Sequence, residues 1–130
     1  MDATRLPELV DRLLTTAHSA SSGRAAQTLY GSADHRLRQT VIALVAGNRM
    51  ADHESPGEAS LQILRGHVTL STATEQWEGV DGDLLAIPDA RHGLLAQQDS
   101  VPIDPRQSAS TAESDRPTTI SRQARAHGWR

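Results

Sequence analysis

Cysteine is absent from this chain of 130 residues. Disulfides, thiolate metal sites and cysteine nucleophiles are therefore impossible, and any metal ion would have to be bound by histidine and carboxylate side chains. Lysine and phenylalanine are absent too, which leaves Trp77, Trp129 and Tyr30 as the aromatic residues apart from histidine. Stacking platforms for bases or sugars are consequently scarce, and the core has to be built from Leu, Ile, Val and Ala.

The chain also lacks an excess of positive charge and a long apolar run. Its formal net charge is −3, although five of its arginines fall within the last 25 residues, so we expect no direct nucleic-acid partner. Nowhere do about 18 apolar residues follow one another, and acids interrupt the apolar N-terminal stretch, which argues against a membrane span or a secretory signal. We therefore expect a cytoplasmic protein with no membrane partner.

One amphipathic helix is predicted over roughly residues 5–18. Its apolar residues recur at helical spacing, and Pro7 falls in the first turn, where its missing N–H does no harm. The polar face mixes both charge signs, which favours a helix packed on the outside of the core over one that binds a membrane or a partner. Residues 1–23 are therefore expected to form this helix and a linker that ends at Gly23.

From residue 24 onward the pattern changes to short segments rich in β-formers and separated by Gly, Pro or Asp. The run from Val41 to Ala46 is apolar throughout, which predicts a strand buried on both faces. Turn signals about every 8 to 12 residues are typical of an all-β sandwich or barrel. The segments with strand character are 24–30, 37–47, 58–66, 67–73, 76–79 and 82–97.

Two stretches resemble the paired motifs of the cupin superfamily. They are "GNRMADHESPGEASLQILRG", Gly47 to Gly66, and "GDLLAIPDARHG", Gly82 to Gly93, and Pro88 of the second also falls in register. The resemblance covers about residues 24–100 and is strongest to small single-domain bacterial cupins, a subgroup with no assigned reaction. It implies a jelly-roll barrel over residues 24–103 whose mouth holds a ligand or metal, and it implies a homodimer.

The resemblance also implies where metal ligands would lie, namely three histidines and one glutamate. His53 matches the first histidine, whereas Ser55 stands at the second position and Ala59 at the glutamate. His92 is the counterpart of the last histidine, although "PDARH" has one residue fewer before it than the family motif. Fe, Mn, Zn or Ni would be the metals of such a site.

Glu58 is a candidate substitute for the missing carboxylate. Strand alternation sets it on the face opposite to Ala59, Leu61 and Ile63, and a bulge next to Gly57 could bring it inward. The candidate metal ligands are thus His53, His92 and Glu58. Because two imidazoles without a carboxylate rarely hold these metals, a degenerate metal site is expected, and a bound divalent metal stays the alternative.

The chain changes character again after Ser100. Residues 104–130 contain prolines and a Ser/Thr/Ala-rich middle without a usable period, which predicts a disordered tail. A cupin barrel should continue here with another apolar strand, so "PIDPRQ" indicates a closing strand that is truncated or replaced. That would leave an unpaired sheet edge for a dimer partner or the tail to cover.

These features favour a small barrel that binds a small molecule and has no catalytic residues. The first alternative is a metal-dependent cupin enzyme of the oxygenase or isomerase type that uses His53 and His92. The second is an accessory sensor in transcriptional regulation, which would contact DNA only through a partner protein because the sequence has no helix-turn-helix pattern.

Overall fold

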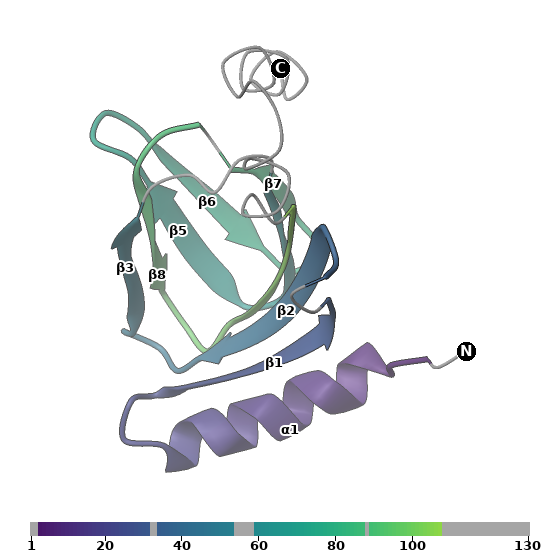
Figure 1. Ribbon diagram of the computed structural model, residues 1–130. Helices are drawn as coiled ribbons and strands as arrows, with labels where there is room; N and C mark the ends of the chain where they lie inside the picture. Colours follow the sequence, from purple (N-terminus) through teal and green to yellow (C-terminus); the bar gives the residue numbers. More distant parts are fainter. Residues whose placement is uncertain (1–2, 32–33, 54–58, 88, 108–130) are drawn as a thin grey trace.

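The computed structural model describes residues 3–31, 34–53, 59–87 and 89–107, with the backbone alone for residues 52–53 and 105–107. In these ranges the chain forms one helix followed by nine strands (Figure 1). The elements are α1 (Leu6–Ser19), β1 (Arg24–Tyr30), β2 (Leu37–Leu44), β3 (Arg49–His53), β4 (Ser60–Arg65), β5 (His67–Ser71), β6 (Gln76–Val80), β7 (Leu84–Ala86), β8 (His92–Ala96) and β9 (Val101–Gln107).

The strands form two antiparallel sheets. One has five strands in the order β1-β2-β9-β4-β7, and the other has four in the order β3-β8-β5-β6. In each sheet a strand from the C-terminal part of the chain lies between two strands from earlier in the sequence: β9 lies between β2 and β4, and β8 lies between β3 and β5. The chain therefore crosses repeatedly between the sheets, as it does in jelly rolls. The all-β jelly-roll barrel expected from the sequence is therefore confirmed.

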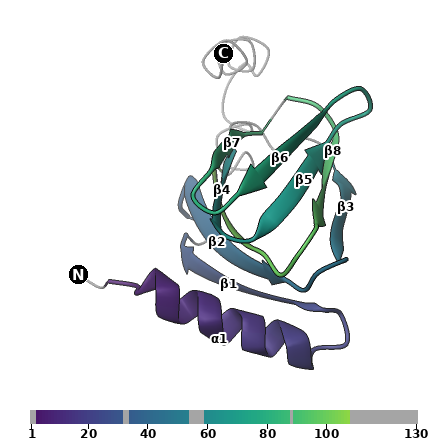
Figure 2. The same cartoon turned by 180° about the vertical axis from the view of Figure 1, so that it is seen from behind.

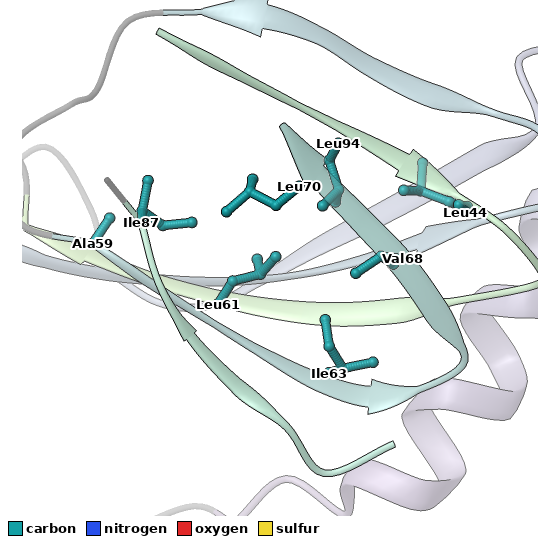
Figure 3. Packing of buried hydrophobic residues seen from close by; sticks show 9 residues of the cluster. Leu44, Ala59, Leu61, Ile63, Val68, Leu70, Ile87 and Leu94 are labelled. Carbon is teal, nitrogen blue, oxygen red and sulfur yellow. The ribbon is translucent and has the colours of Figure 1, made fainter. Parts of the chain in front are cut away.

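The space between the two sheets is filled by alternate side chains of the strands. On β4 and the residue before it, Ala59, Leu61 and Ile63 are buried whereas Gln62 is exposed, which confirms the predicted alternation. Figure 3 shows how these side chains meet those of the opposite sheet. The buried residues of this interior cluster are Leu44, Ala59, Leu61, Ile63, Val68, Leu70, Ile87, Leu94 and Ala96.

A second cluster lies on the outer face of the five-stranded sheet, under α1. The helix runs beside β1 and β2 in both views (Figures 1 and 2) and buries Leu9, Val10, Leu13 and Ala17. On β2, Val41 and Ala43 face this helix, while Leu44 belongs to the interior cluster. The strand is therefore buried on both faces, as its apolar run predicts, and α1 lies within one residue of its expected bounds.

A polar contact fastens the C-terminal end of α1 to the barrel. His18 Nε2 lies 2.6 Å from Asp99 Oδ2, and the backbone N–H of Ala46 donates to Asp99 Oδ1 at 2.9 Å. The hydrogen bond from Ala46 lowers the pKa of Asp99 below its ordinary value, and His18 adds to this effect.

The helix is too short to cross a membrane, and no other described segment is helical and apolar enough to do so.

The expectation that the closing strand is truncated or replaced is wrong. β9 lies in the centre of the five-stranded sheet, between β2 and β4. At each of its two prolines β9 pairs with one neighbouring strand only. Pro102 pairs with Ile63 of β4, and Pro105 pairs with Gln39 of β2. Proline, which has no backbone N–H to donate, is tolerated at such positions.

This correction also removes the predicted unpaired edge at the closing strand, and with it one reason to expect a dimer. β9 continues to Gln107, beyond residue 103, where the barrel was expected to end. The rest of the expected disordered tail, residues 108–130, lies outside the described residues.

Candidate functional site

A small cavity lies between the two sheets of the barrel. Its volume is about 20 Å³, which is room for a water molecule or an ion and far below the roughly 300–1,000 Å³ typical of pockets for organic ligands. Five of the seven lining residues are apolar, and the other two, His92 and Asp104, are polar. The lining consists of Met50, Leu61, Leu70, Ile87, His92, Leu94 and Asp104.

The side chain of His92 reaches the cavity because successive side chains of β8 point to opposite faces of the sheet. It shares the interior face with Leu94 and Ala96, and only 4% of its surface is exposed. Its Nδ1 lies 2.9 Å from the backbone carbonyl oxygen of Ala90. Because a carbonyl can only accept, Nδ1 carries the proton in this contact. This contact fixes the tautomer in the way that is usual for histidines that bind metals through Nε2.

His53 lies opposite His92 in the pairing of β3 with β8. The register shifts between Met50 and His53, since three steps on β3 match the two steps from Leu94 to His92 on β8. Without this bulge, Asp52 would lie opposite His92. The bulge therefore brings His53 to the register position opposite His92, and the side chain of His53 is outside the described part of the chain.

Asp104 is a site residue that sequence reasoning missed. It is 6% exposed and comes from β9, where Val101 and Ile103 face the helix cluster. Because successive side chains of a strand point to opposite faces, Pro102 and Asp104 point toward the barrel interior. The alternation of Val101 and Ile103 was the signal that could have revealed this strand, but the neighbouring prolines led us to assign Asp104 to the tail.

The third predicted ligand, Glu58, lies outside the described residues, and so does Pro88. Within the part of the chain whose side chains are described, no group of three or more histidine or carboxylate residues could hold a metal ion. His92 and Asp104 do fit a metal in chemical type, because imidazole nitrogen and carboxylate oxygen are the donors used by Fe, Mn and Zn sites. The structure thus brings together one predicted ligand and one unpredicted carboxyl group.

No protein-family model matches the sequence, and no curated protein matches it either. The fold of this chain does resemble those of several solved structures. A conserved protein of unknown function from Streptococcus pyogenes is 23% identical with a TM-score of 0.61, and the match covers 68% of this chain and 77% of that one. A cupin superfamily protein from Desulfitobacterium hafniense is 16% identical with a TM-score of 0.60, over 65% and 77% of the two chains.

A third similar structure is an enzyme. Salicylate 1,2-dioxygenase from Pseudoaminobacter salicylatoxidans, in complex with gentisate, is 21% identical with a TM-score of 0.67. The match covers 82% of this chain but only 33% of the dioxygenase chain. Together with the two sheets and their strand order, these likenesses show that the protein has the fold of the cupin superfamily, in a small single-barrel form.

Proposed function

We propose that this protein is a small-ligand-binding cupin, and that its ligand sits inside the barrel at His92. The observation that carries the proposal is the buried imidazole of His92, held by the Ala90 carbonyl and presented to a cavity that is otherwise mostly apolar. Convergent polar groups in an apolar, concave setting are the usual features of a binding site.

The chemistry of the cavity indicates what kind of ligand fits. In the tautomer whose Nδ1 donates to the Ala90 carbonyl, Nε2 of His92 can accept a hydrogen bond or bind a cation, and so can the carboxyl oxygens of Asp104. The ligand should therefore be a cation or a hydrogen-bond donor, and a carboxylic acid would meet repulsion from Asp104. A volume of about 20 Å³ limits the ligand to an ion or a group of a few atoms unless the lining moves.

Titration of the full chain, followed by ¹H–¹⁵N NMR, tests this proposal. The probes are methylammonium chloride and zinc chloride, with sodium salicylate as an acid of the kind expected to fail. We expect saturable shifts of the Leu94 and Ile103 amides with at least one cationic probe, and we expect His92→Ala to abolish them. His67→Ala is the matched control, because His67 pairs with Glu78 on the surface, 2.5 Å from Nε2 to Oε1. No saturable shift with either cation, or shifts retained in His92→Ala, would overturn the proposal.

A second candidate function is a metal-dependent enzyme of the oxygenase type, using His53 and His92. The register that sets these two residues opposite each other favours it, and a bound metal would supply Lewis-acid or O₂ chemistry. The cavity volume weighs against an aromatic substrate such as gentisate. Oxygen uptake by iron-loaded protein with gentisate, lost in His53→Ala and His92→Ala, would establish this function, and uptake at the level of buffer would exclude it for this substrate.

A further inference from the structure

We infer that this chain binds a second copy of itself head to tail, through two different corners of the barrel. One corner, at the tip of the β1–β2 hairpin, is apolar and basic and is called the hairpin corner. The other, at the turn from β6 to β7, is apolar and acidic and is called the turn corner. Neither involves the ligand cavity. Four of the five large apolar side chains that stay exposed in the described part of the chain lie at these corners, namely Tyr30, Leu37, Val80 and Leu84.

The hairpin corner consists of Tyr30, Arg36, Leu37 and Arg38. Tyr30 lies opposite Gln39 across the β1–β2 pair, because the register shifts just before it. Leu37 precedes Gln39 by two positions on β2, so all three side chains lie on the outer face of the five-stranded sheet. Tyr30 is 48% exposed and Leu37 is 44% exposed, and the arginines on either side of Leu37 are exposed too. The hairpin tip therefore presents two apolar groups beside two cations.

The turn corner consists of Val80, Asp81, Asp83 and Leu84. Val80 ends β6 and Leu84 begins β7. The backbone N–H of Asp83 donates to the Val80 carbonyl at 2.9 Å, and the N–H of Val80 donates to Asp83 Oδ2 at 2.8 Å. Asp81 Oδ1 accepts the N–H of Gly66 at 2.6 Å. These bonds fix a tight turn that holds Val80, 48% exposed, close to Leu84, 67% exposed.

The two corners carry opposite charge. Residues 75–84 contain four acids and neither arginine nor lysine, whereas residues 30–38 contain two arginines and one acid. His67 pairs with one of the four acids, Glu78. Surfaces of opposite charge attract each other and fix the register of a contact, whereas surfaces of like charge repel. The partner that fits the turn corner is therefore the hairpin corner of another copy, and two identical corners do not fit each other.

The corners also lie at opposite edges of one sheet. β1 and β7 are the edge strands of the five-stranded sheet, and α1 lies beside β1 (Figures 1 and 2). Leu84 pairs with the exposed Gln62, so it lies on the same outer face as Leu37. A contact between unlike corners leaves each copy with one corner unoccupied, so the association is heterologous and extends into chains or rings. It differs in this from a two-fold symmetric dimer, and its small area makes it weak and transient.

Analytical ultracentrifugation of the full chain is the first test. At concentrations from about 10 μM to 1 mM, where weak contacts associate, the average mass should rise beyond that of two chains. Raising the salt concentration from about 0.01 M to 1 M shortens the Debye length from about 30 Å to 3 Å and should weaken the association. A mass that stays at one chain, or that stops at two, would overturn the inference.

Two variants then separate the corners. Leu37→Ser alters the hairpin corner and Leu84→Ser the turn corner, and both side chains are exposed, so both variants should fold. Each alone should associate about ten-fold more weakly than the unchanged protein. Mixed, they should form a one-to-one complex of unchanged affinity, because the intact turn corner of Leu37→Ser meets the intact hairpin corner of Leu84→Ser. Ala73→Ser is the matched control, since Ala73 is exposed in the turn before β6, at the end opposite to Val80. A symmetric dimer would show no such rescue, and its absence would refute the head-to-tail contact.

A measurement without substitutions covers the case in which a variant fails to fold. On dilution of ¹⁵N-labelled wild-type protein, the amide signals of Tyr30, Leu37, Val80 and Leu84 should shift together, with one midpoint, while that of Ala73 stays in place. Shifts confined to one corner would indicate a symmetric contact, and shifts at neither corner would indicate no contact through these side chains. Either result would overturn the inference, and neither bears on the ligand proposed for the cavity.

Discussion

Gly66 connects β4 to β5, and replacing it with alanine should be one of the most damaging small substitutions in the barrel. Its φ is +112°, a region that residues with a side chain rarely adopt. A Cβ there would lie 2.3 Å from Ser100 Oγ and 2.5 Å from the Asp99 carbonyl oxygen. Both neighbours belong to the turn that leads into β9, and Ser100 is fully buried, so neither can move away easily.

The magnitude can be worked out from two contributions. Backbone strain at such a φ costs about 1–3 kcal/mol, and forcing extra volume into a packed site costs about 1–3 kcal/mol more. Gly66→Ala should therefore lower the free energy of unfolding by about 2–6 kcal/mol. Gly82 offers a matched control, because its φ is +86° but a Cβ added there meets nothing within 4 Å. Gly82→Ala should show the backbone contribution alone.

Urea unfolding of the two variants beside the unchanged protein measures this difference, because the midpoint multiplied by the slope gives the free energy of unfolding. Gly66→Ala should be less stable than Gly82→Ala by about 1–3 kcal/mol. Equal losses in the two variants would refute the reasoning, since they would show that the turn before β9 yields to the added carbon.

Two further predictions concern the attachment of α1. Because the pKa of Asp99 is lowered in the folded state, its contact with His18 and Ala46 stabilises the protein above the ordinary pKa of 3.8 and is lost as the pH falls through the lower folded value. Asp99 is partly exposed, so Asp99→Asn should cost at most about 1 kcal/mol at pH 7, and urea midpoints that still differ equally at pH 2.5 would contradict this. Leu13→Ala removes a side chain that is 4% exposed under the sheet and should cost about 2–5 kcal/mol; a thermal midpoint within one degree of the unchanged protein would show that α1 contributes little to the fold.

The sequence was sufficient to predict the elements with a clear period. The helix, the doubly buried β2 and the alternation of Ala59, Leu61 and Ile63 follow from where apolar residues recur, because burial imposes these periods directly. Gly47, Gly66 and Gly82 of the two motifs all have a positive φ.

Two features of the candidate site could not be predicted from local sequence. The bulge before His53 depends on how β3 pairs with β8, which no single strand encodes. β9 was missed because Pro102 and Pro105 are usually excluded from central strands, and only the complete sheet shows that each lies where β9 is paired on one side. Asp104 was therefore assigned to the tail and not to the barrel interior.

The most direct test of the proposed ligand site is a crystal structure of the protein soaked in turn in zinc chloride and in methylammonium chloride. The proposal predicts new density for at least one of these cations inside the barrel, beside the ring of His92. A barrel interior with no added density in either crystal, or cations bound only at surface side chains such as His67, would contradict it.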